Sequence, residues 1–281
     1  MKCKLVDVFT KEKLSGNGLT IFYETDDLTT KQMQSLTQEM RQFESIFLSI
    51  ENGKFYARIF TVEEELDFAG HPLIGLAAHL HEEYGVNSSH DWNVELNNRT
   101  VALKTRKSGD YFEAIMEQGK PEFIKVFNEN ESEVFLSALN LTWENVSGFP
   151  LEVISTGLPY LIVPIQSGIE SVKVCVENLE NLLSVHGAKF VYIIDTQIFE
   201  GRTWDNLGKV EDIATGSAAG PVGAFLYKND LVTGNQSIVI KQGRFLGRPS
   251  EIKVSLKVQG SDLCNILVSG QVCKVANIEF V

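Results

Sequence analysis

Two short segments of the chain combine the residue types that proton-transfer chemistry uses. Asp67–Pro72 reads Asp-Phe-Ala-Gly-His-Pro, and Glu211–Pro221 reads Glu-Asp-Ile-Ala-Thr-Gly-Ser-Ala-Ala-Gly-Pro. Each is a glycine-containing turn that leads into an apolar, weakly charged helical pattern. A helix N-terminus presents unpaired N–H groups and a partial positive charge, so it binds a carboxylate or stabilises an enolate-like oxygen. The two predicted helix starts, Gly70–Pro72 and Thr215–Ser217, are therefore candidate anion-binding sites.

Two ionisable side chains belong to these turns, one in each half of the chain. His71 stands beside the first helix start, where the helix dipole favours the neutral imidazole. Asp212 lies in the matching turn, and its carboxylate could orient that ring. Taken singly, His71 would be a capping residue and Asp212 a turn-stabilising side chain. Thr215 and Ser217 would be plain N-caps. The pairing of two similar turns favours a functional site.

Glu44 is the third candidate for proton chemistry. It falls where a predicted helix gives way to a strand, just before the apolar Ile46–Leu48. A partly desolvated carboxylate at such a junction could act as a proton carrier. A solvent-exposed helix end is the plainer interpretation of an arbitrary glutamate, and the residues alone leave the two interpretations open.

The elements that must position these residues are mostly strands in the first half of the chain. Thr29 and Gln32 have the spacing of a capping box and predict a helix that ends near Phe43. A second, buried helix is expected over 73–84, with Pro72 at its first position and Gly85 at its C-terminal cap. Short β-type runs predict strands at 5–9, 19–23, 45–50, 55–60, 92–96, 101–105 and 111–116.

The second half of the chain repeats this plan. Helices are expected over 132–139 and 222–228, and strands at 153–155, 160–164, 190–195, 237–241, 252–257, 265–269 and 271–280. We predict an α+β fold with two pseudo-symmetric lobes, each a mostly antiparallel sheet or barrel wrapped around a central helix. The lobes would comprise residues 1–118 and 119–281, with the last strand, near 271–281, returning to the first lobe. Chance similarity of two glycine-rich turns is the alternative explanation.

Composition excludes several classes of function. The 281 residues include 25 Lys+Arg and 37 Asp+Glu, a net charge of −12, and no basic stripe that would coat nucleic acid. The longest uncharged run, 153–169, is interrupted by glycines and prolines and cannot form a membrane-spanning helix. Charged residues at the start of the chain do not fit a signal peptide. We therefore expect a cytoplasmic protein with neither nucleic acid nor a membrane as partner.

Motifs for metal, nucleotide or nucleophilic chemistry are missing. The four cysteines form no CxxC pair, and His79 and His81 would point to nearly opposite sides of a helix. Gly16 and Gly18 lack the third glycine of a dinucleotide fingerprint. Ser217 has no nucleophile-elbow pattern because glycine directly precedes it. We expect no metal site and no cofactor.

Together these motifs resemble the PhzF family of phenazine-biosynthesis-like isomerases. The two turns are similar to the signature turns of that family. Further stretches agree in order along nearly the whole chain: Asp7–Thr10, Gly16-Asn17, Glu44 with Phe47, Ser155–Pro159, Gln242-Gly243 and Gly247–Pro249.

The resemblance implies the diaminopimelate-epimerase-like fold, with the active site between the lobes. Family members are cofactor-independent, usually homodimeric, and move a proton within a small carboxylate-bearing substrate; the best-known one isomerises trans-2,3-dihydro-3-hydroxyanthranilate. By motif position, Glu44 resembles the shuttling glutamate, and His71 and Asp212 resemble the assisting histidine and aspartate. The resemblance further assigns four residues to substrate binding: Asn17, Gly70, Gly216 and Ser217.

The chain departs from the family pattern at several positions near the motifs: Gly18, Phe43, Leu73 and Ile213. These changes bear on the identity of the substrate, since the acid–base residues are all present. The sequence therefore predicts an isomerase or epimerase of a small anionic carboxylate, working as a homodimer. The alternative is a catalytically silent protein that binds a metabolite or a protein partner in the same cleft. A hydrolase using Ser217 lacks an adjacent base and ranks last.

Overall fold

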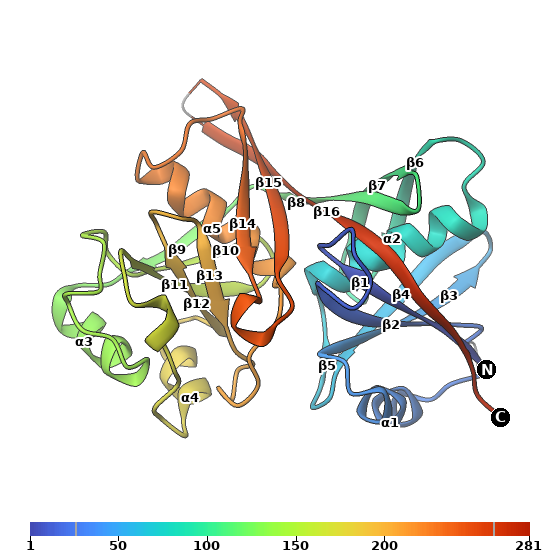
Figure 1. Ribbon diagram of the computed structural model, residues 1–281, viewed down its shortest axis with the longest axis horizontal. Helices are drawn as coiled ribbons and strands as arrows, with labels where there is room; N and C mark the ends of the chain where they lie inside the picture. The colour runs from blue at the N-terminus through green and yellow to red at the C-terminus, as the bar shows by residue number, and fades with distance from the viewer. Residues whose placement is uncertain (26, 261) are drawn as a thin grey trace. The chain divides into compact units, whose positions relative to one another are not determined.

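The chain folds into two compact units, each with a mixed sheet and a buried helix (Figure 1). A computed structural model describes residues 1–25, 27–260 and 262–281. Unit 1 comprises Met1–Glu117, Gly247–Glu251 and Val268–Val281, and unit 2 comprises Gln118–Leu246 and Ile252–Leu267. The prediction of an α+β fold dominated by strands is confirmed.

Unit 1 is built on a sheet with strand order β1-β2-β3-β4-β6-β7-β8, to which the later part of β16 adds by pairing with β1. The pairs β2–β3 and β4–β6 are parallel, and the short β5 pairs with β4. The strands of this unit are β1 (Lys2–Val8), β2 (Asn17–Tyr23), β3 (Glu44–Glu51), β4 (Lys54–Thr61), β5 (Glu65–Leu66), β6 (Ser89–Glu95), β7 (Thr100–Ser108) and β8 (Tyr111–Gly119).

Two helices cover opposite faces of this sheet. Helix α1 (Thr30–Met40) begins with the predicted capping box but ends before Phe43, because Arg41 adopts a left-handed conformation with φ 54° and caps it. Helix α2 (Gly70–Tyr84) packs on β1, β2, β3, β6 and β7. It begins at Gly70, within the predicted helix start Gly70–Pro72 and before the range 73–84, so Pro72 lies within its first turn. Every residue from Gly70 to His81 is buried, which confirms the expected burial, and Gly85 is its C-cap.

Unit 2 has the strand order β16-β15-β14-β13-β12-β11-β10-β9, with parallel pairs at β11–β12 and β13–β14. Its strands are β9 (Glu122–Val126), β10 (Glu152–Ser155), β11 (Pro159–Ile165), β12 (Phe190–Asp195), β13 (Glu200–Thr203), β14 (Ser237–Gln242), β15 (Ser250–Gln259) and β16 (Asp262–Glu279). The two strands predicted at 265–269 and 271–280 are one continuous strand, β16. Strands β9 and β13 had no predicted counterpart.

The buried helix of unit 2 is α5 (Gly216–Lys228), which packs on β10 and β11. It begins within the predicted helix start Thr215–Ser217 and well before the range 222–228, because Pro221 is accommodated inside the helix. Gly223 faces β15, where a side chain would meet Val254. The remaining helices are α3 (Glu129–Ala138), α4 (Leu179–Ser184) and two 3₁₀ turns, η1 (Ile169–Ser171) and η2 (Arg244–Leu246). Across the described part of the chain, every helix is too short or too polar to cross a membrane.

Candidate acid–base site

Glu44 is the first residue of β3, and its side chain points toward helix α2. In the parallel β2–β3 pair, Glu44 is in register with Leu19, and the two therefore share one face of the sheet. Leu19 faces α2, since a Cβ added at Gly75 of that helix would lie 2.4 Å from its Cδ2 atom. The Glu44 side chain is only 8% exposed. Its interpretation as a solvent-exposed helix end is therefore wrong.

His71 meets Glu44 on that face. Because α2 begins at Gly70, His71 lies in its first turn and is 2% exposed. Its Nδ1 atom lies 2.9 Å from Oε2 of Glu44 and 3.4 Å from Nδ2 of Asn17, the first residue of β2. The structure thus brings three of the predicted site residues together within unit 1.

The contact between Glu44 and His71 is close but not aligned as a hydrogen bond. Within the described part of the chain, Oε2 of Glu44 makes no hydrogen bond of acceptable angle, although Nδ1 of His71 is 2.9 Å away. Nδ1 can donate a proton toward Glu44 or accept a hydrogen bond from Asn17, but not both at once. The imidazole therefore has two tautomers that suit its neighbours, and only the one with its proton on Nδ1 turns a donor toward Glu44.

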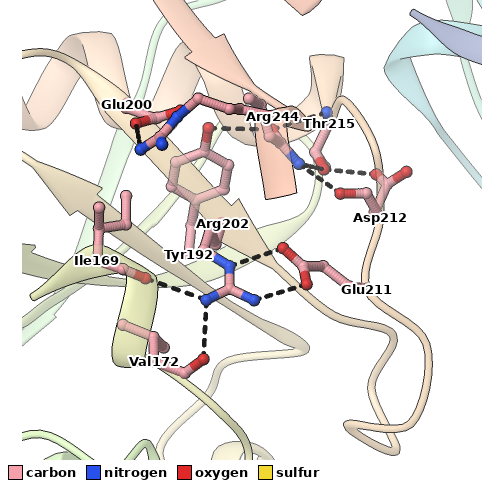
Figure 2. A network of polar contacts seen from close by, with 10 residues as sticks. Ile169, Val172, Tyr192, Glu200, Arg202, Glu211, Asp212, Thr215 and Arg244 are labelled. Atoms are coloured by element: carbon pink, nitrogen blue, oxygen red, sulfur yellow. Dashed lines mark hydrogen bonds and ion pairs between the residues drawn. The ribbon is translucent and has the colours of Figure 1, made fainter. Parts of the chain in front are cut away.

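Asp212 lies in the loop before α5, and three hydrogen bonds fix it. Its backbone N–H donates to the Thr203 carbonyl of β13 at 3.0 Å, and its own carbonyl accepts from Nε2 of Gln242 at 2.9 Å. Oδ2 of its carboxylate accepts from the Thr215 hydroxyl at 2.5 Å (Figure 2). Asp212 is 3% exposed. The bond to Thr215 is the turn-stabilising contact that the plainer interpretation of Asp212 required.

The first turn of α5 carries Gly216 and Ser217. Thr215 occupies the N-cap position, but its side chain makes no capping hydrogen bond. The Ser217 hydroxyl lies 2.7 Å from the hydroxyl of Tyr160, and both residues are buried. Thr215 is therefore the N-cap by position only, and the N-cap interpretation of Ser217 is wrong. The Gly216 carbonyl accepts from Nε2 of Gln118 at 2.8 Å, which ties the start of the helix to the end of β8.

Gln242, Tyr160 and Tyr192 were not predicted as parts of the site. Gln242 is 1% exposed and bonds to both Asp212 and Thr215. The Gln242-Gly243 pair belongs to the family resemblance, but nothing in its local sequence indicates a contact with a turn some thirty residues away. Only the pairing of β13 with β14 brings Gln242 to that turn.

His79 and His81 of α2, whose close spacing could suggest a metal site, contact different groups. His81 contacts the Thr105 hydroxyl at 2.6 Å and the Asn87 carbonyl at 2.9 Å. His79 stacks on Tyr23, and burial lowers the pKa of its imidazole to about 4. Among the described residues, no group of three or more His, Cys, Asp or Glu side chains is arranged to hold a metal ion.

The fold defines a class of protein. A hydroxyproline epimerase from Agrobacterium vitis has the same fold, with a TM-score of 0.63 at 12% identity, and the match covers 99% of this chain and 91% of that one. The fold is thus diaminopimelate-epimerase-like, as the sequence predicted.

The family itself follows from the sequence match. The model of the phenazine biosynthesis-like proteins, PhzC-PhzF, matches residues 6–277, and the chain belongs to this family. A trans-2,3-dihydro-3-hydroxyanthranilate isomerase from Pseudomonas chlororaphis is 33% identical over 275 residues, covering 95% of this chain and 94% of the relative. A solved structure from Pseudomonas aeruginosa, titled a predicted epimerase, is 43% identical with a TM-score of 0.95, covering 100% of this chain and 99% of that one.

Proposed function

We propose that this chain, an isomerase of the phenazine biosynthesis-like family, moves a proton between two positions of a small carboxylate-bearing substrate without a cofactor. The single observation that carries the proposal is the buried contact of Glu44 with His71, at 2.9 Å. A carboxylate and an imidazole at this separation, shielded from water, form a pair that can take up and return a proton. The isomerase relative at 33% identity supports the reaction class.

Each site residue has a role in this proposal. Glu44 removes a proton from a carbon of the substrate and delivers it to another carbon, or to the opposite face of the same one. The electron pair of the broken C–H bond moves into an enolate-like system during the transfer. His71 shares the proton with Glu44, and Asp212 stabilises the developing charge. The proposal requires that Asp212 act on the same substrate as Glu44.

The substrate carboxylate is assigned to the starts of the two buried helices. Gly70 opens α2, and Gly216 and Ser217 open α5. Amide N–H groups in the first turn of a helix favour an anion through both hydrogen bonding and the helix dipole. Asn17 contacts His71 and is also assigned to substrate binding. The enzyme is proposed to work as a homodimer in the cytoplasm.

Two substrate classes follow from the relatives. The isomerase from Pseudomonas chlororaphis points to a cyclic amino acid of the dihydro-hydroxyanthranilate type, and the homologous structure titled a predicted epimerase points to inversion at a stereocentre. Both reactions remove a proton activated by a neighbouring carbonyl or conjugated system. They differ in where the proton returns, so the product distinguishes them.

Solvent deuterium separates the enzyme from a silent binding protein. The protein is incubated in D₂O with trans-2,3-dihydro-3-hydroxyanthranilate and, in parallel, with cyclic and acyclic amino-acid carboxylates, and each compound is recovered for mass spectrometry and NMR. We expect deuterium to enter one of them at a carbon, at a rate proportional to enzyme concentration. Tight binding without any exchange would show instead that the protein only holds its ligand.

A further inference from the structure

Gln242 connects three residues in and around the Asp212 turn: Tyr192, Asp212 and Thr215. It ends β14 and is 1% exposed. Its Oε1 atom accepts from the Tyr192 hydroxyl at 3.0 Å and from the Thr215 backbone N–H at 3.1 Å. Its Nε2 atom donates to the Asp212 carbonyl at 2.9 Å and to the Thr215 hydroxyl oxygen at 3.1 Å. Both ends of the amide are thus fully used.

The partners of Gln242 fix which way its amide points. A backbone N–H can only donate, so the amide oxygen must face Thr215 N; a carbonyl can only accept, so the amide nitrogen must face Asp212 O. The Thr215 hydroxyl therefore receives a hydrogen bond from Gln242. Its own hydrogen is left to point at Oδ2 of Asp212, 2.5 Å away. The direction of that hydroxyl is set by Gln242.

The series of hydrogen bonds begins at Tyr192, whose hydroxyl donates to Gln242. Burial raises the pKa of its phenol, and the negative charge of Asp212 nearby raises it further. The phenol therefore keeps its proton and donates it to Gln242. The resulting relay runs from Tyr192 through Gln242 and Thr215 to one carboxylate oxygen of Asp212.

A second set of contacts fixes the residue before Asp212. Arg202 and Glu211 form a bidentate ion pair, with both N–O distances 2.7 Å (Figure 2). Their side chains are only 10% and 13% exposed. The same guanidinium donates to the carbonyls of Ile169 and Val172. The side chain of Glu211 is thus fixed by Arg202, and the carbonyl and carboxylate of the next residue, Asp212, are fixed by Gln242 and Thr215.

We propose that Gln242 and Thr215 are positioning residues that hold Asp212 charged and oriented for the proton transfer. The inference rests on the proposed function, because it assigns these residues a task in the reaction that Asp212 assists. A hydrogen-bond donor aimed at a carboxylate stabilises the ionised form, and a fixed donor costs no reorganisation during the reaction. A glutamate at position 242 would lack both donors and would add a buried negative charge.

Four variants test the proposal by deuterium exchange on the active substrate. Thr215→Val and Gln242→Met remove the donors, Thr215→Ser keeps the hydroxyl, and Thr196→Val is the matched control. Thr196 is a buried threonine of the same unit whose hydroxyl donates to a backbone carbonyl, Ile165 O, at 3.1 Å. We expect Thr215→Val and Gln242→Met to lower kcat about 10- to 100-fold, with KM nearly unchanged. Thr215→Ser is expected to restore most of that loss, and the control should match the wild-type rate.

Two readouts separate positioning from general damage to the fold. The ascending limb of the pH–rate profile should move to higher pH in Thr215→Val, since the ionised carboxylate loses its donor. In an Asp212→Asn background, Thr215→Val should lower the rate less than about twofold, because the carboxylate that Thr215 orients has already been removed. Equal losses in both backgrounds, or an unmoved pH profile with full activity, would overturn the proposal.

A measurement without substrate keeps this inference distinct from the proposed function. Urea unfolding of wild type, Thr215→Val, Asp212→Asn and the double variant should show less than additive shifts of the midpoint, because the two residues share one hydrogen bond. Additive shifts would contradict the relay whatever the activity. If wild type exchanges no deuterium with any carboxylate while the shifts are non-additive, the proposed function fails and the relay remains.

Discussion

The two groups of site residues are held in different ways. In unit 1, Glu44 approaches His71 to 2.9 Å without an aligned hydrogen bond. In unit 2, Asp212 is bonded through its amide, its carbonyl and Oδ2, and its partner Thr215 is itself held by Gln242. One carboxylate sits in a close but loosely defined contact, and the other sits in a network of directed bonds.

This difference matches what the two carboxylates are proposed to do. A proton carrier must change its protonation state and its partner in each catalytic cycle, so strong fixed hydrogen bonds to one state would raise the barrier for the other. A group that only stabilises charge works best when it is oriented in advance. The comparison therefore teaches that two buried carboxylates can differ in how firmly they are held, so burial alone does not distinguish the roles proposed for them.

The largest expected effect comes from breaking the support of the Asp212 turn. Arg202→Met leaves Glu211 and two backbone carbonyls without their partner in a largely buried place, so we expect a loss of about 3–5 kcal/mol in the free energy of unfolding. Urea denaturation followed by circular dichroism measures it.

A similar ion pair in unit 1 is the matched control for this variant. Arg58 and Glu65 also form a bidentate ion pair, but their side chains are 32% and 23% exposed. Arg58→Met should therefore cost only about 1 kcal/mol or less. Equal losses for the two arginine variants would mean that the network around Asp212 is no more rigid than an ordinary surface pair.

The second expected effect is that the stability of the fold depends on pH through His79. This dependence must be known before the pH–rate profiles of variants are compared. Burial lowers the pKa of His79 to about 4 from a usual 6.5, and its Nδ1 atom has no hydrogen-bond partner among the described residues. The unfolded chain therefore binds a proton between pH 6.5 and 4 that the folded chain does not. Stability contributed by neutral His79 is complete above pH 6.5 and is lost as pH falls to about 4.

The size of this loss is about 3 kcal/mol over that range. His79→Phe keeps a ring against Tyr23 and removes the titrating group, so its unfolding free energy should change less with pH than that of wild type. Thermal or urea unfolding at several pH values measures the slope. An unchanged slope would show that other groups control the acid sensitivity of the fold.

The third effect compares the two carboxylates directly through stability. Asp212→Ala leaves the Thr215 hydroxyl without its acceptor in a buried place, at a cost of about 1–3 kcal/mol. Glu44→Gln breaks no aligned hydrogen bond, so its unfolding free energy should lie within about 0.5 kcal/mol of wild type. If Glu44→Gln destabilised the protein as much as Asp212→Ala, the contrast between a loosely and a firmly held carboxylate would not stand.

Sequence reasoning could reach most of the elements, and the two turns that carry His71 and Asp212, because both depend on local patterns. A few neighbouring residues are enough to predict the Asn52-Gly53 hairpin, the capping box of α1 and the apolar run of α2. Helix boundaries were harder to predict where proline was taken as a start signal. Pro72 lies in the first turn of α2, where its missing N–H costs no intrahelical hydrogen bond, and Pro221 lies inside α5.

Features that depend on tertiary pairing could not be predicted. Glu44 is buried because β3 is inserted between β2 and β4 with its face against α2, which no window around residue 44 indicates. The role of Gln242 requires β14 to lie beside β13. The short strand β13 itself, Glu200–Thr203, is too short and too polar to carry an alternating signal.

The claim that Glu44 carries the proton is tested most directly by solvent exchange with one matched pair of variants. Glu44→Gln removes the carboxylate, and Glu51→Gln makes the same change at the exposed end of the same strand. With the substrate that wild type exchanges in D₂O, we predict that Glu44→Gln incorporates deuterium at least about a thousandfold more slowly while Glu51→Gln matches wild type. Deuterium entering at the wild-type rate in folded Glu44→Gln would contradict the account.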